Sequence, residues 1–237
     1  MTTDPKNIDD VKAQTCLRLA PVNLQGRALG LAPGDLLVRL DGQPLEGPAA
    51  QLLKHAQAHS DIDHLLSLRR DKKEWSVLSS SLALGRWKAE ACPDQVSASS
   101  ARIERMRNWD VLVNDEGRYD AHPRRAPGLA LLAPIYLIQM RLWAALAVWV
   151  ALTLLGLAVG WLLGVSLQIL ICFYVWRAAP ALFRADRYGR GFYLWRVIAA
   201  NSETDLHQQV TQLAPDLTFV LSRSKPEVAT SDETPMT

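Results

Sequence analysis

The most informative feature of this chain of 237 residues is a long stretch without charge. Between Leu142 and Trp176, 35 consecutive residues include no Asp, Glu, Lys, Arg or His, although charged residues make up 21% of the chain. A straight helix of that length would measure about 50 Å, whereas the hydrocarbon core of a bilayer is about 30 Å thick. The stretch is therefore too long for one membrane span and suits two short spans joined by a tight turn.

Other absences exclude several classes of function. The uncharged stretch holds no carboxylate and no histidine, which excludes intramembrane metal or carboxylate catalysis and makes a transporter or channel acting alone unexpected. The sequence has no GxSxG elbow, Walker A loop or dinucleotide fingerprint. A net charge of +2 without a basic stripe does not favour nucleic acid. We therefore expect no enzyme, no cofactor and no nucleic-acid partner.

Cysteine and histidine give little sign of a special site. Cys16, Cys92 and Cys172 are far apart and form no CxxC pair, so we expect three reduced thiols. His55 and His59 share a helix face, but the segment lacks the Glu of an HExxH zinc helix, which favours a solvated helix end over a metal site. The first residues are polar and lack an apolar segment, so no cleavable signal peptide is expected and the soluble half is predicted to be cytoplasmic.

Tryptophans divide the uncharged stretch into two arms. Trp143 and Trp176 mark its ends, and Trp161 lies beside Gly160 near its middle. Because tryptophan prefers the membrane interface, this spacing favours a hairpin with spans at 142–159 and 161–177 over one tilted helix. Gly156, Gly160 and Gly164 recur every four residues, and two interpretations stay open. Either they line one face of a continuous helix, or Gly160 makes the turn while the other two pack the arms together.

Arginines on both sides of the stretch predict its orientation. Arg141 precedes the stretch and Arg177 follows it, each with further arginines nearby. A hairpin brings both basic flanks to one side of the membrane, and the positive-inside rule makes that side cytoplasmic. A single span would leave one basic flank outside. We expect a multi-pass protein of the bacterial inner membrane with both termini in the cytoplasm.

Two segments beside the hairpin read as interfacial helices. Residues 127–140 are apolar, but fourteen residues interrupted by Pro134 are short for a span. Residues 180–198 mix arginines with Tyr, Phe and Trp, which suits a helix at headgroup level; an ordinary soluble amphipathic helix is the alternative.

Residues 15–87 predict a separate, small β-rich domain. Residues 48–59 read as a short helix, and residues 63–85 as a hairpin with Asp71, Lys72 and Lys73 at its tip. The segment GLAPGDLLVRLDGQPLEG, from Gly30 to Gly47, resembles the core signature of PDZ domains. Gly30 and Gly34 permit the backbone turns, and Asp35 can bond local amides. Three apolar side chains of the following strand are then expected on one side: Leu36, Val38 and Leu40.

The PDZ resemblance implies that an extended peptide binds by strand addition. The segment matching the carboxylate-binding loop, Thr15 to Leu19, has no glycine, so carboxylate capture of the usual kind is not expected. If the groove binds a strand, the expected residues are on its strand and on its helix: Leu17, Leu19, Leu52 and His55. Core packing is the alternative for all four.

The second half carries another resemblance. Residues 108–135, NWDVLVNDEGRYDAHPRRAPGLALLAPI, are similar to the opening of an uncharacterised bacterial inner-membrane family, and later segments extend the similarity over about 106–210. It implies a topology and no activity. Residues 88–105 read as a linker, residues 1–14 as disordered, and residues 211–237 as a polar tail.

Together these patterns predict an α+β protein in which a PDZ-like domain precedes a helical membrane hairpin with flanking interfacial helices. The expected function is a non-enzymatic adaptor or accessory subunit of a larger membrane complex, anchored in the lipid bilayer, with a cytoplasmic peptide or strand as a possible ligand. The alternative is a regulator of a membrane protease, or a biogenesis factor that recognises client tails.

Overall fold

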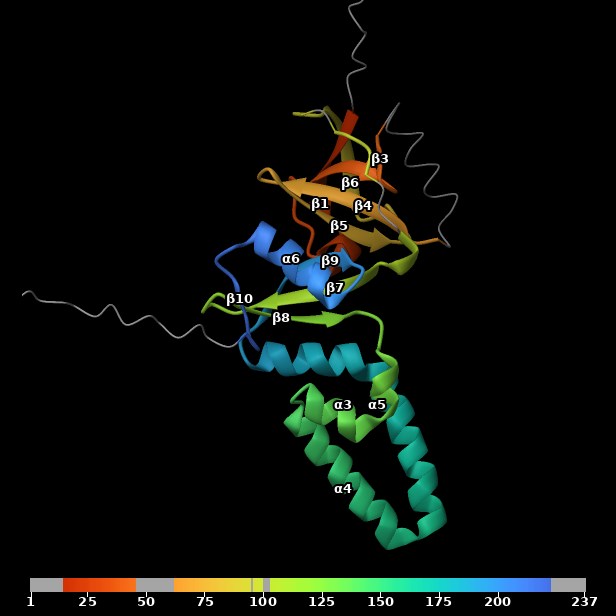
Figure 1. Ribbon diagram of the computed structural model, residues 1–237. Coiled ribbons are helices and arrows are strands. Elements are labelled where there is room, and N and C mark those ends of the chain that lie inside the picture. The colour runs from red at the N-terminus through yellow and green to blue at the C-terminus, as the bar shows by residue number, and fades with distance from the viewer. Residues whose placement is uncertain (1–14, 46–61, 95, 100–102, 223–237) are drawn as a thin grey trace, which may run out of the picture.

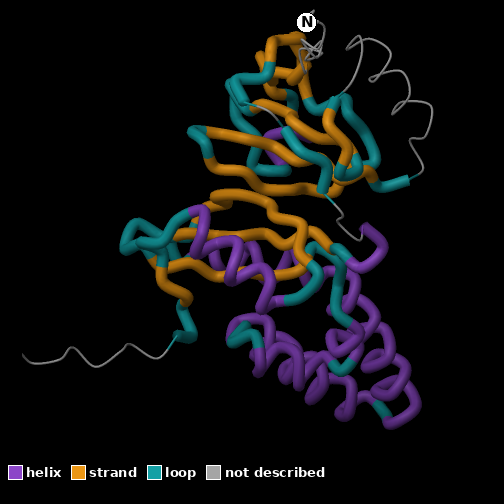
Figure 2. The backbone as a smooth tube through the Cα atoms, turned by 45° about the horizontal axis from the view of Figure 1, so that its top comes forward, coloured by secondary structure: helices purple, strands orange, loops and turns teal. Residues whose placement is uncertain are grey.

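Two β-sheets and a group of helices make up the computed structural model, which describes residues 15–45, 62–94, 96–99 and 103–222. The chain is mixed α+β. Figure 1 shows the sheets stacked one above the other, with the helical part below the second sheet. The helical part is a pendant hairpin and a short helical layer between the hairpin and the sheet (Figures 1 and 2).

The first sheet is built from the N-terminal half in the order β5-β4-β2-β1-β6, and the short β3 pairs with β2. Helix α1 (Leu24–Ala28) follows β1. The strands are β1 (Thr15–Val22), β2 (Leu36–Leu40), β3 (Gln43–Pro44), β4 (His64–Arg70), β5 (Lys73–Ser79) and β6 (Gly85–Ala91).

Turn residues and one irregularity set the register of this sheet. Asp71 and Lys72 both have positive φ, which suits the two-residue turn that joins β4 and β5 at the predicted tip. The pairing of β2 with β4 shifts between Leu37 and Arg39. This shift moves Leu40 against the main core, while Val38 packs in a separate cluster with Cys16. The predicted common side of β2 is therefore wrong at Leu40.

The second sheet has the order β10-β8-β7-β9, and its strands come from distant parts of the second half. Helix α6 (Glu203–Leu213) packs on it, and a single 3-10 turn, η1 (Ile103–Arg105), precedes it. The strands are β7 (Arg107–Val113), β8 (Arg118–Pro123), β9 (Tyr193–Ala200) and β10 (Thr218–Phe219).

One apolar core connects the two sheets. Leu68 of β4, Val111 of β7 and Val197 of β9 belong to a single buried cluster, and β5 contacts β9 across the junction. The predicted domain boundary at 87 and linker at 88–105 do not separate two cores, because the buried cluster includes residues of both sheets, and β6 extends past that boundary to Ala91. The predicted tail from residue 211 also needs correction, since α6 ends within it and β10 pairs with β8.

The helical part comprises η2 (Gly128–Leu131), α3 (Ala133–Gln139), α4 (Trp143–Val159) and α5 (Trp161–Gly189). Among the described residues, α5 is the one helix long and apolar enough to cross a membrane, and α4 is a shorter apolar helix of 17 residues. The chain turns between them at Gly160, whose φ of 148° favours glycine. A Cβ atom on Gly164 would lie 3.2 Å from the carbonyl oxygen of Gly156, so these two glycines let the arms meet.

Helix α5 corrects the prediction of a separate interfacial helix at 180–198. The helix continues through Pro180 to Gly189, and Tyr193 then begins β9. Proline removes one backbone donor and bends a helix, and Figure 1 shows α5 turning to lie beneath the second sheet. Tyrosine, tryptophan and isoleucine in this stretch have high strand propensity, so the aromatic residues indicate a strand as well as an interface.

A close backbone contact makes Gly85 a sensitive position. Its Cβ atom, if present, would lie 2.2 Å from the carbonyl oxygen of Pro21, where β6 meets the bulge of β1. We expect Gly85→Ala to lower the free energy of unfolding by about 1–3 kcal/mol through overpacking. Urea unfolding of the purified full chain in detergent measures this change. Gly128→Ala is the matched control, because nothing lies within 4 Å of that position; equal losses in both variants would refute the steric explanation.

Candidate functional site

The predicted peptide groove does not lie on β1. Leu17 and Leu19 are fully buried in the core, and β1 is hydrogen-bonded to β2 on one side and to β6 on the other. A third strand cannot add to β1 while β6 is in place. Leu52 and His55, the predicted helix side of the groove, lie outside the described residues.

One edge strand of this sheet is β6, and the other, β5, contacts β9 of the second sheet. Among the described residues, β1 is the one strand that pairs with β6, and the opposite edge of β6 has no partner strand. Arg86, Lys88, Ala89 and Glu90 are exposed on it, while Trp87 packs partly against the core and donates to the carbonyl oxygen of Leu82. An edge strand carries unpaired backbone N–H and C=O groups, which is the chemical requirement for strand addition.

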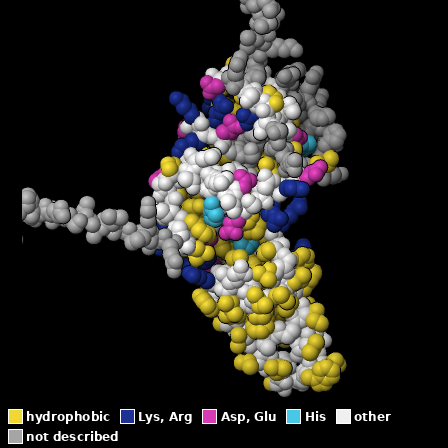
Figure 3. Space-filling view, viewed as in Figure 1, with side chains coloured by type: hydrophobic (Ala, Val, Ile, Leu, Met, Phe, Trp, Pro, Cys, Tyr) yellow, Lys and Arg dark blue, Asp and Glu magenta, His cyan; other side chains and the backbone are white. Residues whose placement is uncertain are grey.

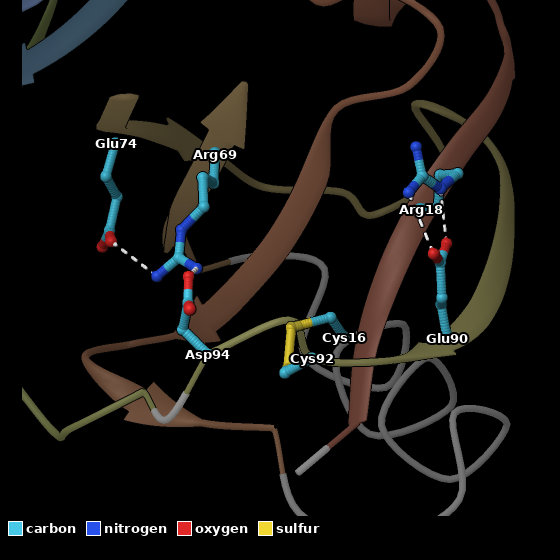
Figure 4. The surroundings of a disulfide bond; sticks show 7 residues. All are labelled: Cys16, Arg18, Arg69, Glu74, Glu90, Cys92 and Asp94. Atoms are coloured by element: carbon cyan, nitrogen blue, oxygen red, sulfur yellow. Dashed lines mark hydrogen bonds and ion pairs between the residues drawn. A yellow bond between two sulfur atoms is a disulfide. The ribbon is translucent and has the colours of Figure 1, made fainter. Parts of the chain in front are cut away.

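A disulfide joins β1 to the end of β6, which corrects the prediction of three reduced thiols. Cys16 and Cys92 are bonded, with a Cα–Cα distance of 5.0 Å, and Cys172 is free. Figure 4 shows the bond close to the exposed ion pair between Arg18 and Glu90. The pairing of Cys16 opposite Glu90 brings the two cysteines together, although 76 positions separate them in sequence.

Charged side chains also lie buried where the two sheets meet. The Asp35 carboxylate is fully buried, accepts from the Ala32 amide as predicted, and is bound by Arg70 at 2.6 and 2.8 Å. The Arg196 guanidinium of β9 stacks 4.1 Å from the ring centre of Trp75 in β5. Burial, and then the nearby charge of Arg70, lowers the pKa of Arg196 to about 10. The indole ring provides part of the stabilisation that water would give this cation.

A second buried network joins the bent end of α5 to the second sheet. Arg187 of α5 donates to Asp120 of β8 and to Asp186, each at 2.6 Å. Arg124 donates at 2.6 Å to Asp110 of β7, which is almost fully buried. Sequence reasoning missed these contacts. The available signal was the presence of Asp110 and Asp120 inside otherwise apolar strands, where a carboxylate needs a partner.

His122 lies in the same junction as a neutral side chain. Its Nε2 atom is 2.8 Å from the Tyr136 hydroxyl of α3, and its ring stacks on Phe183 of α5 at 4.5 Å. Burial lowers the pKa of His122 to about 4 and raises the pKa of Tyr136 above its usual range. The histidine, the phenol and the two carboxylates paired with arginines each have a hydrogen-bond partner, as expected of a structural joint.

The buried His122 predicts a pH dependence of stability. An unfolded histidine binds its proton near pH 6.5, whereas the folded one does so only near pH 4. The contribution is therefore complete above about pH 6.5 and is lost as the pH falls towards 4. We expect a loss of about 2 kcal/mol between about pH 7.5 and pH 5 from this group, at 1.36 kcal/mol per pKa unit. Urea unfolding at both pH values should show this difference in the wild type.

The variant His122→Gln isolates the effect, because the amide can still bond the Tyr136 hydroxyl but does not titrate. The pH-dependent loss should shrink in this variant and remain in His207→Gln, where a partly exposed histidine of α6 is changed. The same loss in all three proteins would assign the pH dependence to other groups.

The residues predicted to anchor the hairpin at the membrane interface lie at its ends and at its tip. Trp143 at the start of α4 is 58% exposed and Trp161 at the tip is 75% exposed, although both are apolar. Trp176 is partly buried against the helical layer, and Arg141 and Arg177 are exposed. Figure 3 shows hydrophobic side chains covering the pendant hairpin, with basic side chains above it.

The described residues hold no group of three metal-ligating side chains. His55 and His59 fall outside those residues, and His64 is nearly buried with its Nδ1 atom 2.7 Å from Asp41. Comparison with protein-family models and with curated proteins finds no match to this chain.

Proposed function

We propose that this protein is a non-enzymatic adaptor, or accessory subunit, of a larger complex in the bacterial inner membrane. In this proposal α4 and α5 form a membrane hairpin. The first sheet acts as a PDZ-like binding domain, and a partner segment adds to the outer edge of β6. The observation that carries the proposal is the combination of an exposed apolar hairpin with an unpaired, charged strand edge on the same chain.

The apolar surface of the hairpin supports membrane insertion. Leu154, Leu157 and Leu162 are each more than 60% exposed, which is unfavourable in water and favourable in lipid. Helix α4 has 17 residues and is about 25 Å long, slightly less than the hydrocarbon thickness, a mismatch that local thinning or the flanking residues accommodate. Tryptophans at both ends of the arms suit the two interfaces.

The sidedness of the membrane follows from the arginines, which favour a cytoplasmic location for both sheets. The disulfide favours the opposite side, because such bonds persist in oxidising compartments. We retain the cytoplasmic placement on the evidence of the arginines. Backbone pairing of β1 with β6 holds the two cysteines side by side, so we expect the bond to form when the purified protein leaves the reducing cytoplasm. Reporter fusions at about residue 100 and residue 230 test this: both should read cytoplasmic, and two periplasmic readings would invert the orientation. The thiol of the variant Gly160→Cys should then be labelled from the periplasm alone.

The edge of β6 supports partner binding. Arg86 and Lys88 have no acidic partner among the described residues, so a strand carrying acidic side chains would find complementary charge there. The sequence after Gly30 and the β4–β5 hairpin resemble PDZ domains, whose ligands bind in this manner. This arrangement replaces β1 by β6 as the strand that receives the ligand.

Affinity purification of the full chain from mild detergent tests the proposal. A stoichiometric partner should copurify with the wild type and be depleted at least fivefold with Arg86→Glu/Lys88→Glu. The matched control is Arg105→Glu/Arg107→Glu, which makes the same charge change away from β6 and should retain the partner. A protein that runs alone refutes the accessory-subunit role. Substoichiometric partners that vary between preparations would favour a factor that recognises client tails.

A further inference from the structure

The two arms of the hairpin leave a groove between them on the side of the helical layer. The arms touch near the tip, where Gly156 meets Gly164, and separate towards α3 (Figure 1). The groove has a volume of about 460 Å³. Its walls are large apolar side chains, chiefly Val148, Trp149 and Leu152 from α4 and Leu170 and Tyr174 from α5. This volume lies within the range of small-ligand pockets.

One residue of the groove wall, Trp149, carries a donor that has no partner among the described residues. The indole Nε1–H of Trp149 is buried and has no acceptor, whereas the nearby Gln168 amide is bonded to the Thr153 hydroxyl. Indole nitrogen is a donor only, and hydrocarbon supplies no acceptor. Because that nitrogen is buried, it offers a ligand in the groove no polar contact, and the groove wall at Trp149 is apolar.

Two exposed arginines, Arg141 and Arg177, lie at the ends of the arms, although neither lines the groove itself. Leu170, Tyr174 and Arg177 follow one another at helical spacing on α5, so Arg177 lies beyond the groove on the same helix face, towards the polar side. Arg141 precedes α4 at the same level of the hairpin. Neither arginine has an acidic partner among the described residues, while Arg184, Arg187 and Arg190 are each bound to an aspartate.

The lining argues for a lipid chain and against a helix from another protein. Helices that pack in membranes approach through small residues, as the arms themselves do at Gly156 and Gly164. Ala145 is the only small residue that lines the groove. A helix of about 10 Å diameter would fill the whole volume with roughly one turn, whereas a flexible chain can follow it.

We propose that this groove binds one anionic phospholipid, with an acyl chain between α4 and α5 and the phosphate at Arg141 and Arg177. Anionic lipid bound in basic pockets between helices is a general mode of lipid recognition. The inference rests on the membrane insertion proposed above. The bound lipid would fill the gap between the arms and hold them at their observed separation.

Native mass spectrometry of the full chain in mild detergent tests this inference, with phosphatidylglycerol or phosphatidylcholine added at equal concentrations. One phosphatidylglycerol should bind in preference to phosphatidylcholine. The variant Arg141→Gln/Arg177→Gln should lose about fivefold in affinity for each arginine. The control Arg105→Gln/Arg107→Gln should bind as the wild type does.

A second pair of variants probes the groove itself. Val148→Trp places a large ring in the groove and should abolish one-to-one binding, whereas Leu154→Trp, on an exposed face of α4 outside the groove, should not. Equal binding of both lipids, or unchanged binding by Val148→Trp, would overturn the proposal. A copurified membrane protein lost from Val148→Trp would overturn it in favour of a partner helix. Alkaline carbonate extraction of membranes distinguishes these results from failed insertion. A protein that carbonate releases is not inserted in the bilayer, and that result would refute the membrane hairpin.

Discussion

Replacing Cys16 and Cys92 together by serine is expected to lower the free energy of unfolding by about 4 kcal/mol. The bond closes a loop of 76 sequence positions, and chain-entropy arguments give a loop of this length about that stabilisation. The loss should be large because Cys16 is fully buried and the bond holds β6, an exposed edge strand, against β1. Urea unfolding of the full chain in detergent, followed by tryptophan fluorescence, measures it.

The third cysteine provides the control. Cys172→Ser removes a free thiol and should leave the reductant-sensitive part of the stability unchanged. Adding reductant to the wild type should reproduce the loss seen in the double variant. If the double variant unfolds at the same urea concentration as the wild type, the cysteines do not form the bond in solution.

The same pair of cysteines reports the compartment. Thiol alkylation of acid-quenched cells should find Cys16 and Cys92 reduced if the sheets face the cytoplasm, and bonded if they face the periplasm. The redox state of the two cysteines is therefore a second test of membrane orientation, independent of the reporter fusions.

Breaking the ion pair between Arg187 and Asp120 is the second change with a large expected effect. Both side chains are about 9% exposed, and their atoms are 2.6 Å apart. Arg187→Met would leave a buried carboxylate without its cation, which costs about 3–5 kcal/mol. We expect a loss of that size in urea unfolding and faster amide hydrogen exchange in the bent end of α5, which this pair holds against β8.

Two further variants make this prediction specific. Asp120→Asn combined with Arg187→Met removes both charges and should recover part of the loss, because no uncompensated charge remains. Arg190→Met breaks an exposed pair with Asp186 and should cost less than about 1 kcal/mol. Equal losses for Arg187→Met and Arg190→Met would show that burial of the pair has no energetic importance.

Local features of the chain were predictable wherever neighbours in sequence decide the structure. The turn at Gly160 depends on one residue with positive φ between two apolar helices, and the β4–β5 turn depends on Asp71 and Lys72. Asp35 bonds an amide three residues away, so its role is visible in the sequence. In each case a short segment contains all the interacting groups.

Features that join distant segments were decided by tertiary structure alone. The bond between Cys16 and Cys92, the position of β6 beside β1, and the strand in place of a helix after Gly191 all require partners far away in sequence. In a pair of strands, the backbone groups of one segment bond those of another. The sequence of one strand therefore does not show which segment is its partner. The predicted groove failed on Leu17 and Leu19 for this reason.

The uncharged stretch from Leu142 to Trp176 shows the same division within one element. Its length, its lack of charge and its tryptophan spacing favoured two apolar helices over one, because each of these signals lies within the stretch itself. Composition could not show that α5 continues past Pro180 to place Arg187 beside Asp120, nor that the arms separate around a groove. Those properties depend on which surfaces meet after folding, since an ion pair or a groove exists only between segments brought together in space.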